Sequence, residues 1–270
     1  MCGIFGYIMQ SNGDAFYVID NFKKIKHRGP DWSRVEFIND NMVFGFHRLA
    51  INDTSNSGTQ PFITNDFVFV CNGEIYNHKE LRELYGSDKL QGNSDCEIVP
   101  HMIMKIGIKK TLELINGEFA FILFLRHENK VWIANDHLGI RPLFYMINSR
   151  KNVYIASEIK AMGLHKDSTD TPVRLAPGSY AELKFTKPTN QKDLEVKHTW
   201  FDVKSYYELP KCEIEYNPDD YQLYLDTIRD SFMEAVRIRL ECVESSEMVG
   251  FLLSGGLDSS LVCSTARKIL

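Results

Sequence analysis

The chain opens with Met1-Cys2-Gly3-Ile4-Phe5-Gly6, a thiol directly behind the initiator methionine and in front of an apolar run. Cysteine is small enough that the methionine before it is normally removed, which leaves a thiol and a free α-amine on one residue. The amine has a reference pKa of about 7.7–8.0 and the thiol about 8.5, so near neutral pH part of the amine is an unprotonated base. This start predicts a buried strand over Ile4–Met9 behind a residue that serves as nucleophile and general base. The alternative is that Cys2 is a small core residue.

Composition limits the classes of protein that this chain can belong to. With 270 residues, 44% of them hydrophobic and 25% charged, it has room for one large domain or one and a half ordinary ones with a sizeable core. A net charge of -5 gives no indication of nucleic acid or an anionic membrane as partner. No apolar run approaches the roughly 18 residues of a membrane span, and the N-terminus lacks the basic-then-apolar pattern of a signal peptide. The six cysteines lie far apart without a C-x-x-C pair, so we expect neither a disulfide framework nor a metal site, and a cytoplasmic location.

Most of the chain has the short apolar runs of an α+β protein rather than regular βαβ units. We expect helices over Ala15–Lys26 and from a capping box at Ser94 to about Ile106. The expected strands are Val35–Ile38, Met42–Ile51, Phe67–Cys71, Glu118–Leu125, Val131–Asn135, Phe144–Ile147, Val153–Ala156 and Ser179–Phe185.

The pattern changes after residue 210. Asn217-Pro218-Asp219-Asp220 is typical of a helix start, and the apolar stripe behind it continues to about Leu240. Met248–Leu253 is expected to be a fully apolar strand, Ser254–Asp258 a glycine turn and Ser259–Leu270 a helix. Strand, turn and helix in this order are the opening of an α/β nucleotide-binding domain.

Three polar positions in the first part each allow two interpretations. Arg48 lies in an otherwise apolar strand and must be paired, either with Asp31 or with a bound carboxylate. Asn72-Gly73 is a common hairpin-turn dipeptide, but an amide and a glycine N–H can also form an oxyanion hole. Asp95 either favours the start of its helix or pairs with a substrate ammonium.

The stretch Ser254-Gly255-Gly256-Leu257-Asp258-Ser259-Ser260 is the more specific signal. Glycines expose backbone N–H groups to an anion, the hydroxyls add donors and the following helix adds partial positive charge. The stretch lacks the lysine of the Walker pattern. Its form is typical of loops that hold the pyrophosphate end of ATP while the α-phosphate is attacked; the alternative is a flexible turn.

Taken together, the motifs resemble a known family over essentially the whole chain. They follow the order found in class II glutamine amidotransferases, and with the Ser254–Ser260 loop behind them the chain resembles glutamine-hydrolysing asparagine synthetases. The stretches that carry the resemblance are Cys2–Gly6, His27–Asp31, His47–Ile51, Cys71–Asn77, Ser94–Glu97, Asn116–Phe121, Asp136–Leu143 and Ser157–Ala161.

This resemblance implies a fold and a domain order. It implies a four-layer αββα glutaminase domain of the N-terminal-nucleophile type over residues 2–185 and a linker over 186–216. Residues 217–270 would be the start of an α/β synthetase domain of the ATP-pyrophosphatase type. One strand and one helix cannot form a nucleotide domain, and the sequence stops in mid-helix, so we expect the front portion of a longer protein that supports only the glutaminase half.

Roles for individual residues also follow from the resemblance. Cys2 would form a γ-glutamyl thioester, with Asn72 and Gly73 as the oxyanion hole. The α-carboxylate of glutamine would be held by Arg48 and the backbone of Leu49, Ala50, Ile51 and Asn52, and its ammonium by Glu74 and Asp95. The residues that would hold ATP are Leu252, Ser254, Gly255, Gly256, Asp258 and Ser259. Asn135 and Ala176 depart from the family pattern, which puts in doubt the wall between domains rather than the chemistry.

The implied activity is that of a ligase that forms carbon–nitrogen bonds. Glutamine would be hydrolysed to glutamate and ammonia, and ammonia would amidate aspartate after ATP and Mg²⁺ convert it to β-aspartyl-AMP, giving asparagine, AMP and pyrophosphate. The partners are these small molecules, with a homodimer among the assemblies allowed. One alternative is a synthetase with another carboxylate acceptor, similar to β-lactam synthetase. The other is a catalytically inactive glutamine-binding module.

Overall fold

The computed structural model describes residues 1–9, 15–51, 53, 55–86, 90–164, 169–184, 202–209, 211, 217–243 and 249–270. These residues divide into two compact units, Met1–Glu208 and Leu209–Leu270. None of the described helices has the length and apolar character that crossing a membrane requires.

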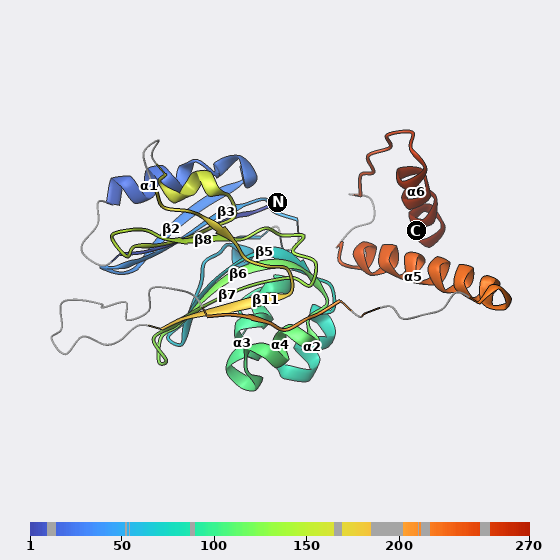
Figure 1. Cartoon of the computed structure of the whole chain (residues 1–270), viewed down its shortest axis with the longest axis horizontal. Coiled ribbons are helices and arrows are strands. Elements are labelled where there is room, and N and C mark those ends of the chain that lie inside the picture. The colour runs from blue at the N-terminus through green and yellow to red at the C-terminus, as the bar shows by residue number, and fades with distance from the viewer. Residues whose placement is uncertain are drawn as a thin grey trace. The chain divides into compact units, whose positions relative to one another are not determined.

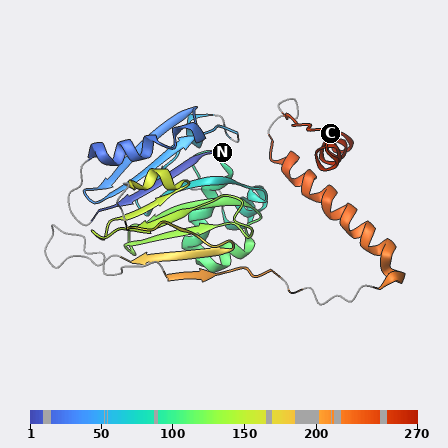
Figure 2. The same cartoon turned by 45° about the horizontal axis from the view of Figure 1, so that its top comes forward.

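The first unit is built on two six-stranded sheets whose strand pairs run antiparallel. In order across the first sheet the strands are β10 (Val173–Arg174), β8 (Phe144–Ile147), β9 (Val153–Ala156), β1 (Gly3–Ile8), β3 (Met42–Arg48) and β2 (Trp32–Asn39). The second sheet consists of β12 (Asp202–Ser205), β11 (Ser179–Lys184), β7 (Lys130–Asn135), β6 (Gly117–Leu125), β5 (Phe67–Ile75) and β4 (Phe62–Ile63). Figure 2 shows β11 and β12 side by side at one edge.

Helices cover the outer faces of both sheets (Figure 1), which confirms the predicted αββα order of layers. Helix α1 (Ala15–Lys23) packs Val18 and Phe22 against the first sheet. The second sheet is covered by α2 (His78–Tyr85), α3 (Ile98–Ile106) and α4 (Ile108–Leu114).

Strand β1 lies in the middle of the first sheet and is buried along its whole length. Because side chains alternate along a strand, Ile4 and Ile8 join the core between the sheets while Phe5 and Tyr7 pack toward α1. Cys2, just before β1, packs against the edge of the inter-sheet core. The chain terminus is thereby held at the end of a rigid central strand.

Three local expectations were wrong. The strand expected to close at Asn72-Gly73 continues to Ile75, because both residues pair with β6. The capping box at Ser94 does not form, since the Ser94 side chain makes no capping bond and the Glu97 carboxylate accepts from Gln91 N and Gly92 N at 2.6 and 3.0 Å. Helices α2 and α4 were not predicted.

The second unit contains α5 (Tyr221–Glu241) and α6 (Leu257–Ile269). The strand expected at Met248–Leu253 is not formed by the described residues 249–253, and Leu252 is 97% exposed. A strand needs a neighbour to take its backbone N–H and C=O groups, and no strand stands beside it among the described residues of this unit.

Candidate functional site

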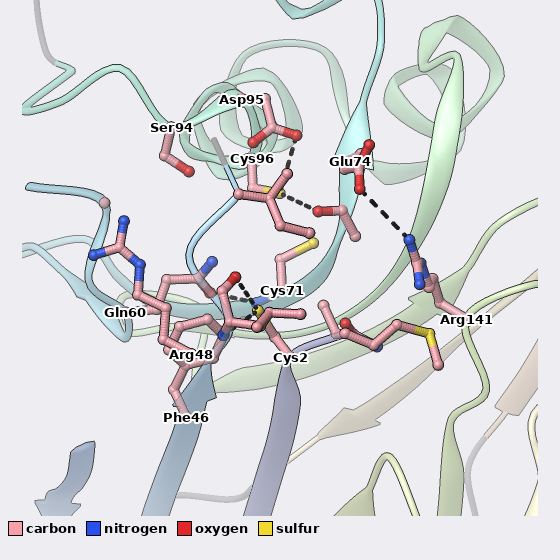
Figure 3. A pocket seen from close by; sticks show the side chains of 16 residues that line it. Cys2, Phe46, Arg48, Gln60, Cys71, Glu74, Ser94, Asp95, Cys96 and Arg141 are labelled. Carbon is pink, nitrogen blue, oxygen red and sulfur yellow. Dashed lines mark hydrogen bonds and ion pairs between the residues drawn. The ribbon is translucent and has the colours of Figure 1, made fainter. Parts of the chain in front are cut away.

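A pocket opens at the end of β1, where the ends of β3 and β5 converge. It encloses about 480 Å³, including the open space at its mouth. Figure 3 shows its lining: Met1, Cys2, Phe46, Arg48, Leu49, Ile51, Gly58, Gln60, Cys71, Asn72, Gly73, Glu74, Ser94, Asp95, Cys96 and Arg141.

The Cys2 thiol lies within this pocket. The register of β1 on β3 pairs Gly3 with His47, so the preceding Cys2 lies beside the end of β3. Its Sγ is 3.3 Å from Leu49 N, which donates to it, and 3.5 Å from Leu49 O. Burial raises the pKa of the Cys2 thiol, while the contact with the Leu49 backbone opposes that rise. The site therefore holds a neutral thiol that needs a base to become a thiolate.

Arg28, which the sequence indicated only as part of the His27–Asp31 stretch, fixes the backbone of Cys2. Arg28 Nε donates to Cys2 O at 2.9 Å, and Arg28 Nη1 pairs with Glu158 at 3.0 Å. The Arg28 side chain is nearly buried.

Met1 precedes Cys2 in the pocket. Burial lowers the pKa of the Met1 α-amine, and the cations Arg141 and Arg28 lower it further.

Arg48 ends β3 and is 6% exposed. Its Nη1 donates to Ser55 O at 2.7 Å and to Thr59 Oγ1 at 3.1 Å, and its Nη2 donates to Asp53 O. The described contacts of Arg48 include no ion pair with Asp31, whose carboxylate accepts from Ala50 N at 2.8 Å. Arg48 thus brings to the pocket a positive charge that no carboxylate neutralises in the described part of the chain.

Asn72 and Gly73 lie on β5, facing Ala120 and Phe119 of β6. Asn72 is 1% exposed, and its Nδ2 donor is buried with no hydrogen-bond partner in the part of the chain that the structure describes. Position 73 requires glycine because the backbone of β6 lies close to it: a Cβ there would lie 2.6 Å from the Phe119 Cα. A buried amide donor without a partner is unusual in a folded protein and is free to bind an oxygen in the pocket.

Two carboxyl groups line the pocket beside Asn72. Asp95 is buried and accepts from Ile75 N at 2.6 Å; burial, with the Glu74 carboxyl adding, raises the pKa of Asp95 to about 6. Glu74 pairs loosely with Arg141 Nη2 at 3.7 Å, and the same atom lies 3.5 Å from Glu118. Figure 3 shows Arg48 and Arg141 on opposite sides of Cys2.

The structure therefore brings most of the expected glutamine site together. Cys2, Arg48, Leu49, Ile51, Asn72, Gly73, Glu74 and Asp95 all line one pocket. Ala50 lies between two lining residues but does not line the pocket itself, and Asn52 lies outside the described residues. Sequence reasoning missed Arg141, whose only signal was its place in the Asp136–Leu143 stretch.

The expected ATP-binding residues lie in the second unit, at the start of α6. Gly255 has a left-handed φ of 84°, which glycine adopts without strain. Ser254 Oγ lies 3.0 Å from Ser259 Oγ, and Gly256 precedes the first turn of the helix. Leu252, Ser254, Gly255, Gly256, Asp258 and Ser259 are all accessible, except that Ser259 is half-buried.

Comparisons with known proteins agree over both units. A family model described as the glutamine amidotransferase domain matches residues 1–195, and one described as asparagine synthase matches residues 227–270. The glutamine-hydrolysing asparagine synthetase of Gallus gallus is 36% identical over 284 residues, covering 100% of this chain and 49% of that protein. The one from Homo sapiens is 32% identical over 289 residues, covering 100% and 49%. The chain spans about half the length of these relatives.

Solved structures support the fold alone. A glutamine phosphoribosylpyrophosphate amidotransferase from B. subtilis superimposes with a TM-score of 0.55 at 20% identity, covering 76% of this chain and 49% of that one. An allosteric regulatory enzyme of purine biosynthesis gives a TM-score of 0.56 at 21% identity, with the same coverage of 76% and 49%.

Proposed function

Because the chain belongs to the glutamine amidotransferase domain family, we propose that its pocket hydrolyses glutamine to glutamate and ammonia, with Cys2 as the nucleophile. One observation carries the proposal most strongly. Cys2, Asn72 and Arg48 line the same pocket, and the Asn72 Nδ2 donor has no hydrogen-bond partner among the described residues. A nucleophile, an oxyanion donor and a carboxylate-binding cation are the groups that this reaction needs.

The proposed reaction requires that Met1 is removed. The α-amine of Cys2 then takes the thiol proton, directly or through a water, and the sulfur attacks the side-chain amide carbon of glutamine. Asn72 Nδ2 and Gly73 N–H stabilise the oxyanion. The carbon–nitrogen bond breaks, ammonia leaves with the proton from the amine, and water hydrolyses the thioester to glutamate. The raised pKa of the thiol makes such a base necessary near neutral pH.

Charges at the pocket walls support the orientation of the substrate. Arg48, with the backbone of Leu49 to Asn52, receives the α-carboxylate, while Glu74 and Asp95 receive the α-ammonium. A bound ammonium favours the ionised form of Asp95, whose pKa of about 6 already leaves it mostly ionised at neutral pH.

For the whole protein, we propose that the released ammonia amidates aspartate. The names of the relatives and the asparagine synthase match support this. The accessible serines, the left-handed Gly255 and the helix start at Leu257 suit a pyrophosphate group, so Ser254, Gly255, Gly256, Asp258 and Ser259 would hold ATP, with Leu252 at the nucleotide. Mg²⁺ would neutralise phosphate charge when ATP is bound. Another carboxylate acceptor stays the alternative.

The remaining expectations stay proposals. We divide the chain into the glutaminase domain at 2–185, a linker at 186–216 and the start of the synthetase domain at 217–270. On the spacing of its cysteines we place it in the cytoplasm, and a homodimer stays a prediction.

Inserting one residue between Met1 and Cys2 tests the first half. Glutamate release should fall at least about 10²-fold, because the base is displaced from the thiol, while iodoacetamide should still alkylate Cys2. A matched control carries the same extra residue after Leu270. Unchanged hydrolysis in the first variant would rule out catalysis by the N-terminal amine.

The second half is tested in the complete enzyme. Asp258→Ala should lose exchange between ATP and pyrophosphate while glutamine hydrolysis continues. Normal exchange would contradict the assignment of the loop.

A further inference from the structure

Two loops that each contribute residues to the pocket lining approach each other, and one buried carboxylate lies between them. The first loop follows β3 and contains Asp53, which is 4% exposed. The second loop, residues 91–94, leads into Asp95. Asp53 has a left-handed φ of 49°, a conformation that few residues other than glycine adopt and that persists where the surroundings hold it.

The Asp53 side chain bonds to both loops. Its Oδ1 accepts from Ser55 N at 3.2 Å and from Ser55 Oγ. Its Oδ2 accepts from Ser57 Oγ at 3.0 Å and from Asn93 N, in the second loop, at 3.0 Å. Burial opposes ionisation, but these hydrogen bonds outweigh it and lower the pKa of Asp53. A charged carboxylate thus ties the loop before Asp95 to the loop after β3.

The main chain of the same residue holds Arg48. Asp53 O accepts from Arg48 Nη2, and Ser55 O accepts from Nη1 at 2.7 Å. The direction of the guanidinium is therefore set by the turn that the Asp53 carboxylate organises. The side chain of Asp53 positions the wall with Asp95, and its backbone positions the wall with Arg48.

The two loops are also in close contact at a glycine. A Cβ on Gly92 would lie 2.8 Å from Ser57 Oγ and 3.0 Å from Asp53 Oδ2. The backbone at Gly92 and the Ser57 hydroxyl therefore lie too close together to leave room for a side chain at position 92. Arg82 fixes the second loop from outside by donating to Gly92 O at 3.1 Å and to Ser94 O at 2.5 Å.

We propose that Asp53 is the positioning residue that sets the separation between the carboxylate-binding and ammonium-binding walls, and so makes the pocket selective for free α-amino acids. This inference rests on the proposed glutamine hydrolysis. The α-carboxylate and α-ammonium are attached to one carbon, so both walls engage them only at one separation. An error of about 1 Å in such an arrangement costs on the order of 10²-fold.

Asp53→Asn is the first test. Asparagine has nearly the same size and tolerates the left-handed conformation. In either orientation of its amide, the NH₂ group faces a backbone N–H, that of Ser55 or that of Asn93, so one anchor is lost. We expect the glutamine KM to rise at least tenfold, with kcat within threefold.

The readout that separates positioning from general damage is alkylation of Cys2 by two reagents. A chloroketone analogue of glutamine carries the α-carboxylate and α-ammonium, whereas iodoacetamide carries neither. In Asp53→Asn the rate with the analogue should fall at least tenfold, and the rate with iodoacetamide should stay within twofold. Gly92→Ala, which forces the loops apart from the other side, should give the same signature.

Asn148→Ala is the control for loss of a turn. Asn148 Oδ1 accepts from Arg150 N at 3.0 Å and Asn152 N at 2.9 Å, between β8 and β9 and away from the pocket lining. It should lower the melting temperature without changing the ratio of the two alkylation rates. A wild-type ratio in both Asp53→Asn and Gly92→Ala, or an equal fall with both reagents, would overturn the inference. A wild-type chain whose Cys2 the analogue does not label would instead contradict the proposed function itself.

Discussion

Replacing Asn72 by alanine should separate catalysis from stability. The Nδ2 donor is buried and has no partner among the described residues, so its removal breaks none of the hydrogen bonds described in the fold. Loss of one oxyanion donor costs about 10²–10³-fold in kcat, which corresponds to about 2.7–4 kcal/mol. We therefore expect glutamate release to fall by that factor.

The free energy of unfolding should not fall. Removing a buried amide without a partner returns about 1–3 kcal/mol of desolvation, and the small cavity left behind costs on the order of 1 kcal/mol. The net change is therefore between zero and about 2 kcal/mol of stabilisation. Urea titration of Asn72→Ala should give a midpoint equal to or somewhat above that of the unaltered chain.

Asn135→Ala is the matched control, because its amide is as deeply buried but is hydrogen-bonded through both its nitrogen and its oxygen. Asn135 Nδ2 donates to Leu175 O at 3.1 Å, and its Oδ1 accepts from Ser179 N at 3.2 Å. The control should lose about 2 kcal/mol or more of stability, since two buried backbone groups lose their partner, with kcat little changed. If Asn72→Ala kept kcat within threefold, or unfolded as readily as Asn135→Ala, the oxyanion assignment would be refuted.

Three further predictions concern the pocket charges and the thiol. Arg48→Lys should raise the glutamine KM at least about tenfold and lower the urea midpoint. One ammonium cannot bind the acceptors at Asp53, Ser55 and Thr59 and a substrate carboxylate at the same time. An unchanged KM would count against the assignment of Arg48 to the substrate carboxylate. Folding raises the pKa of Asp95 from 3.8 to about 6, so this group adds stability at low pH that is lost as pH rises through about 6. Urea midpoints measured between pH 4 and 7 should show this loss of stability, and Asp95→Asn should abolish this pH dependence. The glutamine KM should fall over the same rise in pH, because the Asp95 carboxylate ionises. In a chain that retains Met1, burial raises the pKa of the Cys2 thiol, so the pH profile of its alkylation by iodoacetamide should lie at higher pH than that of free cysteine; a profile at or below that of free cysteine is the contrary result.

Much of the layered fold could be predicted because strands buried on one or both faces leave strong local patterns. The bounds of β8 and β9 agree with the expected Phe144–Ile147 and Val153–Ala156 to the residue. Helix α2 left no such pattern, since Leu81 is its one buried residue. At Asn72-Gly73 the turn-forming dipeptide predicted the end of the strand wrongly, because pairing with β6 overrides the local preference for a turn.

The sequence by itself determined which groups carry the proposed chemistry: a thiol next to a removable methionine, an amide beside a glycine, and a glycine–serine loop before a helix. These are local patterns, and local patterns can be read along the chain. Only the tertiary structure placed Arg28 on the Cys2 carbonyl, Arg141 beside Glu74, and Asp53 between the two walls. Such contacts join residues 26 to 67 positions apart, and they depend on strand register and loop packing, which no short stretch of sequence encodes.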